Sequence, residues 1–296
     1  MSFLSNVISG LSLGSIYAII ALGYTMVYGI AKMLNFAHGD VIMVGAYVCF
    51  FAVGTYNLPP IIGVLLAVAL CTALGMLIER MAYKPLRQAP SLAVLITAIG
   101  VSYFLQNAAL LWWGSDPKKF PAFIVVGEQN GISLFDGQLR ITYVAIVTVV
   151  ACVAIMAGLI AFTGRTKMGK AMRACSEDKG AAQLMGINVN ATISMTFAIG
   201  SALAAIAGVL MCSAYDTLLP TTGSMPGIKA FTAAVFGGIG SIPGAFLGGL
   251  LLGVIQIFTQ AYLSQELADA IVFAVLIVVL LVKPTGLLGK QIQEKV

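Results

Sequence analysis

Charge is scarce in this sequence. Asp, Glu, Lys and Arg together make up 9% of the 296 residues, whereas hydrophobic residues make up 60% and the mean hydropathy is +1.01. Soluble domains carry about 25% charged residues, so a soluble fold of this length would have too little charge for its surface. The composition therefore excludes a soluble domain and predicts an integral membrane protein.

Histidine and cysteine are also scarce, which argues against a metal site or an enzyme. The chain has one histidine and five cysteines, and the cysteines lie singly without a CxxC pair. A structural zinc site needs several such ligands at short spacing. A single histidine and few carboxylates also leave no HExxH motif, no Ser–His–Asp grouping and no paired intramembrane acids. We therefore expect no metal site and no catalytic site.

Long apolar runs are abundant and predict an all-α membrane protein in one domain over residues 1–296. A membrane-crossing helix needs about 20 apolar residues. One further run, 230–240, is Gly-rich and too short to cross the membrane alone. Either 230–240 and 244–262 make two crossings, or the two runs together form a re-entrant element. Segment 113–140 is rich in turn residues and predicts a loop that could hold a small hairpin. The eight candidate spans are 7–31, 41–56, 60–82, 91–112, 141–163, 191–214, 244–262 and 267–282.

Lys and Arg gather in three regions, which predicts the orientation. They concentrate in the loops 79–90 and 163–190 and in the tail after residue 282. Because cytoplasmic loops carry an excess of Lys and Arg, these regions, including the C-terminus, are predicted to be cytoplasmic. Loop 113–140 and the acidic turn 263–269 are then external. We attribute the net charge of +5 to loops that contact anionic lipid headgroups, and not to nucleic-acid binding. The sequence does not decide on which side of the membrane the N-terminus lies.

Residues 164–171, "GRTKMGKA", match the spacing of a nucleotide-binding P-loop. The motif continues with Ala171, where Mg²⁺ coordination needs a Ser or Thr hydroxyl. It also follows an apolar run of membrane length instead of a β-strand, so no glycine loop opens onto a phosphate-binding helix. The sequence therefore predicts that this chain binds neither ATP nor another cofactor here.

The next residues predict a short cytoplasmic helix. Ser176 suits the N-cap, Glu177 and Asp178 place negative charge in the first turn, and Gly186 suits the stop. Such a helix of about ten residues is about 15 Å long and cannot span a membrane. It could lie on the membrane surface or dock into a groove of a soluble partner.

Three polar residues interrupt the apolar pattern in "NFAHGD": Asn35, His38 and Asp40. Intramembrane polar residues are costly and often mark transport pathways, and unwound helices can hold the charged ends of a zwitterion. We therefore predict that they line a translocation pathway. Two alternatives stay open, namely a structural pair of His38 with Asp40 and a turn at the membrane interface.

Small and amide residues predict helix packing elsewhere. The stretch "FGGIGSIPGAFLGG" (236–249) would let helices approach closely, for example at a dimer interface. We expect interhelical hydrogen bonds from four amide side chains: Gln106, Asn107, Gln256 and Gln260.

Three stretches, 23–48, 173–188 and 229–253, resemble the permease subunits of the high-affinity branched-chain amino acid ABC importers. The resemblance implies a bacterial inner-membrane permease that pairs with a second permease of the LivM type. It also implies two cytoplasmic ATPases, which use ATP and Mg²⁺, and a periplasmic binding protein that delivers Leu, Ile or Val.

The resemblance also assigns the short helix as the coupling helix that receives the ATPase motion. The two alanines do not follow Glu177 directly, which departs from the generic coupling motif. The implied coupling residues are Ser176, Glu177, Asp178, Ala181, Ala182 and Gly186.

An ion-coupled secondary transporter of a small zwitterion is the alternative function. Such carriers usually need buried carboxylates within their spans, and Asp40 is the one plausible case in this sequence.

Overall fold

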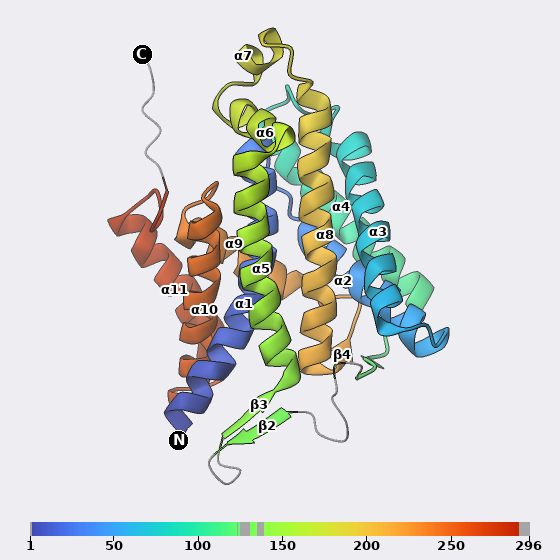
Figure 1. Cartoon of the computed structure of the whole chain (residues 1–296), viewed down its shortest axis with the longest axis vertical. Coiled ribbons are helices and arrows are strands. Elements are labelled where there is room, and N and C mark those ends of the chain that lie inside the picture. Colours follow the sequence, from blue (N-terminus) through green and yellow to red (C-terminus); the bar gives the residue numbers. More distant parts are fainter. Residues whose placement is uncertain (1, 123, 125–130, 135–138, 290–296) are drawn as a thin grey trace.

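Helices form almost all of the structure, a computed structural model that describes residues 2–122, 124, 131–134 and 139–289 (Figure 1). Two of the helices continue as single π-helical turns, η1 and η2. The helical elements are α1 (Ser2–Ala31), α2 (His38–Phe50), η1 (Phe51–Thr55), α3 (Pro60–Ile78), η2 (Glu79–Tyr83), α4 (Ser91–Trp113), α5 (Tyr143–Arg165), α6 (Lys167–Glu177), α7 (Lys179–Leu184), α8 (Val189–Tyr215), α9 (Ser224–Gly237), α10 (Ile242–Tyr262) and α11 (Leu267–Val282).

The predicted spans correspond to helices. In the described part of the chain, seven helices are long and apolar enough to cross a membrane, and they match the first seven predicted runs. The eighth run is α11, which is apolar but has only 16 residues. The prediction of an all-α membrane protein is confirmed.

The molecule has two distinct ends. Figure 1 shows α6 and α7 at one end, called here the α7 end, and the N-terminus with β2 and β3 at the other, the hairpin end. β2 (Gly131–Leu134) and β3 (Leu139–Thr142) pair in antiparallel register, with Gly131 opposite Thr142. The small hairpin anticipated in loop 113–140 therefore forms, although its turn, 135–138, lies outside the described residues. The sequence did not decide the side of the N-terminus. In the structure it lies at the hairpin end, together with loop 113–140.

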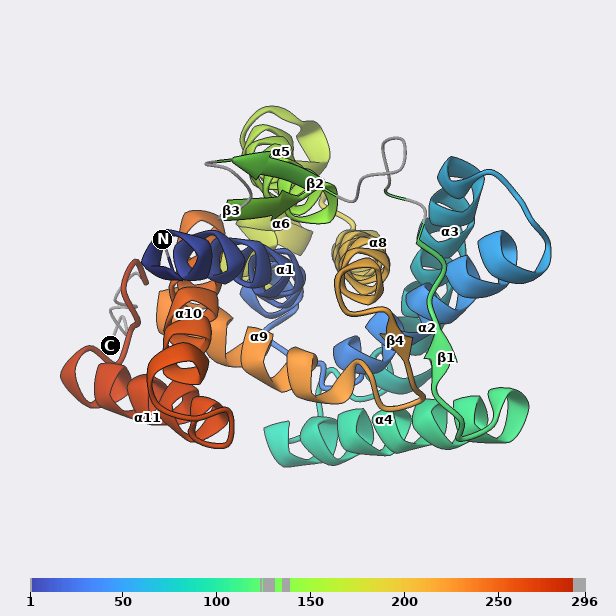
Figure 2. The ribbon, with the colours of Figure 1, turned by 90° about the horizontal axis from the view of Figure 1, so that it is seen from below.

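The segment around 230–240 crosses the bundle. It enters from β4 (Thr217–Leu218), which pairs with β1 (Lys118–Lys119) at the hairpin end. It leaves next to α1 at the α7 end, because a Cβ built on Gly29 would lie 3.1 Å from Gly240 Cα. Figure 2, which looks along the longest axis, shows the 14-residue α9 side-on, so this helix lies obliquely across the bundle, and the residues 219–223 lead into it. Of the two alternatives left open by the sequence, two crossings by α9 and α10 describe the chain.

Small residues of α10 bring three helices together. Figure 2 shows α1 between α10 and α8. A Cβ on Gly249 would lie 2.4 Å from Ala18 Cα in α1, and one on Gly248 would lie 2.2 Å from Ala233 O in α9. The close packing predicted for this stretch is therefore confirmed. It lies inside this chain, so these glycines are not free for an interface with a second permease.

The amide predictions have mixed outcomes. Tyr17 on α1 donates to Gln256 Oε1 on α10 at 2.8 Å, an interhelical bond as predicted. Asn107 donates to Tyr103 O of its own helix at 2.7 Å, so that prediction was wrong, because Asn107 lies on an exposed side of α4. Gln260 makes no side-chain hydrogen bond to the described residues, and Gln106 belongs to the site below.

Candidate functional site

The first part of the site is the break between α1 and α2. α1 ends at Ala31, and Lys32 takes a left-handed conformation with φ +57°. Residues 32–37 then run without helix until α2 begins at His38. Buried Asn35 accepts a hydrogen bond from the Tyr83 hydroxyl of η2 at 2.9 Å, which fixes the break to the end of α3–η2.

The second part is the start of α9, which meets the start of α2. A Cβ on Gly223 would lie 1.8 Å from Gly39 O, and one on Gly227 would lie 2.9 Å from Gly39 Cα. Only glycine permits this approach, so the two backbones touch at their first helical turns. Helix N-termini carry partial positive charge and unpaired N–H groups. The contact therefore concentrates positive potential inside the bundle.

A hydrogen-bonded cluster lies beside this contact. Gln106 Nε2 on α4 is 2.9 Å from Asp40 Oδ1 on α2, 3.2 Å from Ser224 Oγ on α9 and 3.2 Å from Ser102 Oγ on its own helix. One amide thus joins three helices. We name Asp40, Ser102, Gln106 and Ser224 the polar cluster, and the interhelical bond predicted for Gln106 is confirmed.

The other predicted pathway residues lie apart from the cluster. His38 is 1% exposed, its ring centroid is 4.6 Å from that of Tyr24, and a Cβ on Gly23 would lie 2.6 Å from His38 Nε2. His38 Nε2 has no partner among the described residues. The proposed pairing with Asp40 does not form, because α1 encloses the ring while Asp40 points to Gln106. The structure thus brings only Asp40 of the three into the cluster.

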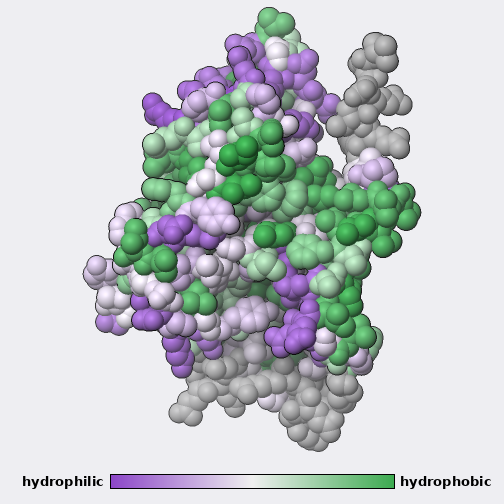
Figure 3. Space-filling model, turned by 180° about the vertical axis from the view of Figure 1, so that it is seen from behind, coloured by the Kyte–Doolittle hydropathy of each residue, from purple (hydrophilic) through white to green (hydrophobic). Residues whose placement is uncertain are grey.

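The polar cluster reaches one face of the molecule. Asp40 is 2% exposed, whereas Ser102, Gln106 and Ser224 are half-buried. Figure 2 shows α4 and α9 along the same edge of the molecule, and Figure 3 shows hydrophilic groups at mid-height of the rear face, within apolar surface. The cluster combines a carboxylate, hydroxyls, an amide and helix N-termini. These groups match both charged ends of an amino acid.

An ion pair that includes a buried lysine was missed by the sequence reasoning. Lys229 of α9 lies 2.6 Å from Asp269 of α11, and the lysine side chain is 9% exposed. A lone lysine inside an apolar run was an available signal, since buried charges in membranes are paired. The pair joins α9 to α11.

The loop 163–190 corrects one prediction. The sequence indicated a single helix starting at Ser176, but the chain forms α6 up to Glu177 and then the separate helix α7. Ser176 donates to Arg173 O at 2.7 Å inside α6. The N-cap is Asp178 instead, whose Oδ1 accepts from the N–H groups of Gly180 and Ala181 at 2.7 and 3.0 Å. Because α6 continues as far as Glu177, Ser176 lies inside that helix and the next good cap is Asp178.

The predicted end of α7 is confirmed. Gly186 has φ +81°, its N–H bonds to Gln183 O at 3.0 Å, and the N–H of Ile187 bonds to Ala182 O at 3.0 Å. These two bonds form a Schellman motif, which needs the left-handed residue that glycine supplies.

The two sides of α7 face different surroundings. Ala182 is 3% exposed, so the Ala181–Ala182 pair is divided, with Ala181 exposed and Ala182 packed inward. Leu184 is 90% exposed and Met185 is 83% exposed. Two neighbouring apolar side chains on a short helix outside the spans form an unpartnered apolar tip.

Lys179 ties the inner side of α7 to the bundle. Its Nζ donates to Ala31 O at the end of α1, at 2.7 Å. Partial burial, followed by the nearby charges of Arg87 and Lys32, lowers the pKa of Lys179. No local pattern predicts this contact, which joins residues 148 positions apart.

A second buried ion pair stabilises the α7 end. Glu79 of η2 pairs with Arg87, accepts from Ser194 Oγ at 2.7 Å and has a side chain 2% exposed. Arg87 also donates to Asn190, so one guanidinium links the loop after η2 to the start of α8. The sequence reasoning counted Arg87 only as an orientation signal and missed this pair.

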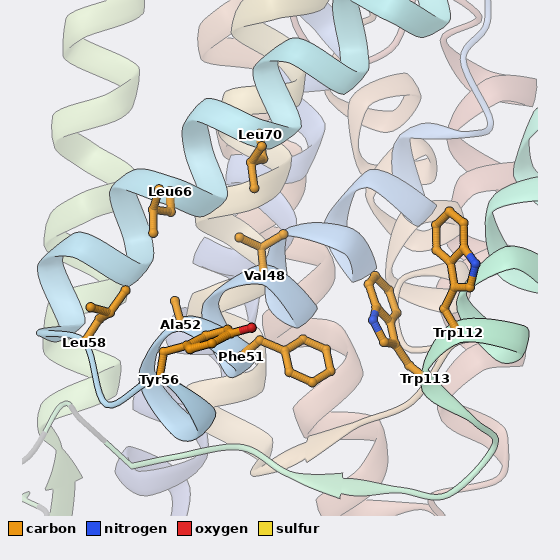
Figure 4. Close-up of a pocket in the computed structure, with 9 residues that line it drawn as sticks. All are labelled: Val48, Phe51, Ala52, Tyr56, Leu58, Leu66, Leu70, Trp112 and Trp113. Carbon is orange, nitrogen blue, oxygen red and sulfur yellow. The ribbon is translucent and has the colours of Figure 1, made fainter.

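An apolar pocket of about 570 Å³ lies between η1, α3 and the end of α4 (Figure 4). No charged side chain lines it, so it offers no countercharge for the ends of a zwitterion. Its lining is mostly apolar, and its polar side-chain groups are the Tyr56 hydroxyl and the indole N–H groups of Trp112 and Trp113. The lining residues are Val48, Phe51, Ala52, Tyr56, Leu58, Leu66, Leu70, Trp112 and Trp113.

Comparison with known proteins places these features in a family. The family model described as "Branched-chain amino acid transport system / permease component" matches residues 6–280. The chain is 46% identical to the high-affinity branched-chain amino acid transport system permease protein BraD of Pseudomonas aeruginosa, over 99% of this chain and 98% of BraD. It is also 46% identical to the corresponding protein LivH of Escherichia coli K12, with the same coverage.

A more distant relative is archaeal. The chain is 28% identical to a probable branched-chain amino acid transport permease protein LivH of Methanocaldococcus jannaschii, over 93% of this chain and 89% of the relative. The family model spans nearly the whole chain, and two relatives match it from end to end. The chain therefore belongs to the family of permease components of branched-chain amino acid transport systems.

Proposed function

We propose that this chain is a permease subunit of an ATP-driven ABC importer that moves Leu, Ile and Val into the cytoplasm. In this proposal it spans the bacterial inner membrane as a single permease domain over residues 1–296, with the α7 end and the C-terminus in the cytoplasm. It pairs with a second permease of the LivM type, and a periplasmic binding protein delivers the amino acid at the hairpin end. It binds no nucleic acid.

The observation that carries the proposal is the exposed tip of α7. Leu184 and Met185 are 90% and 83% exposed on a helix capped at both ends by Asp178 and Gly186. Such a rigid apolar knob fits the helix-in-groove mode of protein recognition. Two ATPase subunits, which use ATP and Mg²⁺, would receive it. The exposed Glu177 and Ala181 flank the same surface.

The polar cluster would provide the transient contact in the membrane. Asp40 can accept from the ammonium group of the amino acid, and the N-termini of α2 and α9 can stabilise its carboxylate. A permease needs weak binding because tight binding would trap its cargo. The cluster fits this requirement, because it has few residues and their polar groups already form hydrogen bonds with one another.

The test is uptake by the purified complex. The tagged protein, isolated in mild detergent with its co-purifying subunits, is reconstituted into liposomes and assayed for ATP-dependent uptake of labelled leucine, with the binding protein supplied. We expect Leu184→Glu to abolish both ATPase co-purification and uptake. Leu263→Glu is the matched control for ATPase co-purification, because Leu263 is 65% exposed in the turn after α10, at the end of the molecule opposite α7.

A different energy source would contradict the proposal. Leucine uptake by the protein alone, independent of ATP and abolished when the ion gradient is dissipated, would identify a secondary carrier. Asp40 would then be the coupling carboxylate to examine next.

A further inference from the structure

A lysine at the start of α7 donates a hydrogen bond to the end of α1. Lys179 Nζ lies 2.7 Å from Ala31 O, and Ala31 is fully buried. The last carbonyls of a helix have no partner within the helix, and a cation is favourable at this negative end. Lys179 therefore satisfies a buried acceptor of α1 from the helix that carries the exposed apolar tip.

The end of α1 leads directly to the polar cluster. After Ala31 the chain turns at left-handed Lys32 and reaches Asp40 within the first turn of α2. On the way, Asn35 is held by the Tyr83 hydroxyl. Movement of the α1 end relative to η2 would shift this short segment, and Asp40 with it. A helix end, unlike the middle of a packed span, can move without disturbing a row of interdigitated side chains.

We propose that Lys179 is a positioning residue, through which displacement of α7 moves the end of α1 and the segment 32–37 that leads to the polar cluster. This inference rests on the proposed function, in which α7 receives the motion of the ATPases. In this proposal Leu184 contacts the ATPase subunits, and Lys179 transmits the resulting displacement of α7 to the end of α1.

The experiment compares variants in the reconstituted complex, with leucine uptake and ATP hydrolysis measured in the same liposomes. We expect Lys179→Met to keep the ATPases bound and hydrolysing while leucine transported per ATP falls at least about tenfold. That fall corresponds to about 1.4 kcal/mol of lost coupling. Lys179→Arg keeps a charged donor and should restore most of the ratio. Lys170→Met, at an exposed lysine of α6, is the matched control and should leave the ratio unchanged.

The ratio separates transmission from a merely structural contact. A contact that only supported folding would lower uptake and hydrolysis together and leave leucine per ATP unchanged. That result, or loss of the ATPases from the Lys179→Met complex, would overturn the proposal. If Lys179→Met does not insert, Lys179→Gln, a shorter neutral donor, decides the question by the same ratio.

A different result would reject the proposed function, namely that the wild-type protein in its complex shows no ATP-dependent leucine uptake. An unchanged ratio in Lys179→Met, alongside loss of uptake in Leu184→Glu, would instead reject the role of Lys179 and keep the importer.

Discussion

Removing Arg87 tests the buried ion pair at the α7 end. The Glu79 side chain is 2% exposed and that of Arg87 is 16% exposed. In Arg87→Met the carboxylate keeps only the hydrogen bond from Ser194, at 2.7 Å, and loses its countercharge. A buried charge left without its partner costs about 3–5 kcal/mol. We therefore expect the free energy of unfolding to fall by about that amount.

The assay is unfolding in mixed micelles of a mild detergent and sodium dodecyl sulfate, followed by tryptophan fluorescence. Lys84→Met is the matched control, because Lys84 is an exposed cation next to η2 and its loss should change little. The double variant Glu79→Gln with Arg87→Met removes both charges, and the neutral amide still accepts from Ser194. It should recover much of the stability that the single variant loses.

Two results would refute this reasoning. Equal stability of Arg87→Met and Lys84→Met would mean that Glu79 is solvated or protonated rather than an unpaired buried charge. A double variant that is less stable than Arg87→Met would mean that the Glu79 carboxylate is favourable at this site even without Arg87.

Three further predictions concern the site. Asp40→Asn keeps a side chain of the same shape but removes its charge, and should lower leucine uptake at least about tenfold while the complex stays assembled, as co-purification would check. Gly223→Ala should abolish uptake, because its Cβ would lie 1.8 Å from Gly39 O and force the two helix starts apart; wild-type uptake would disprove their contact. Lys32→Gly should raise the free energy of unfolding by about 1 kcal/mol, since φ +57° strains residues other than glycine; lower stability would contradict this.

The spans and the end of α7 were predictable because their causes are local. About 20 apolar residues must be consecutive to cross a membrane, and Gly186 stops α7 through its own φ of +81°. The start of α7 was missed because Ser176 and Asp178 are both acceptable N-caps. The break at Asp178 depends on α6 continuing as far as Glu177.

The site was only partly predictable because its residues find their partners across the bundle. Asp40 was expected to be functional, but the sequence did not join it to Gln106, 66 positions away. His38 looked equivalent to Asp40 in the sequence and proved to be enclosed by α1. Lys229 and Glu79 were overlooked, although buried charges within spans are rare enough to be a signal.

The sequence by itself determined the class of protein, its spans and its lack of a P-loop, since each depends on residue type and order along the chain. Tertiary structure decided which polar groups meet. The contact of Gly39 with Gly223, the polar cluster around Gln106 and the bond from Lys179 to Ala31 all join separate helices. The physical reason is that buried hydrogen bonds and ion pairs require partners within about 3 Å, and only packing brings distant helices to that distance.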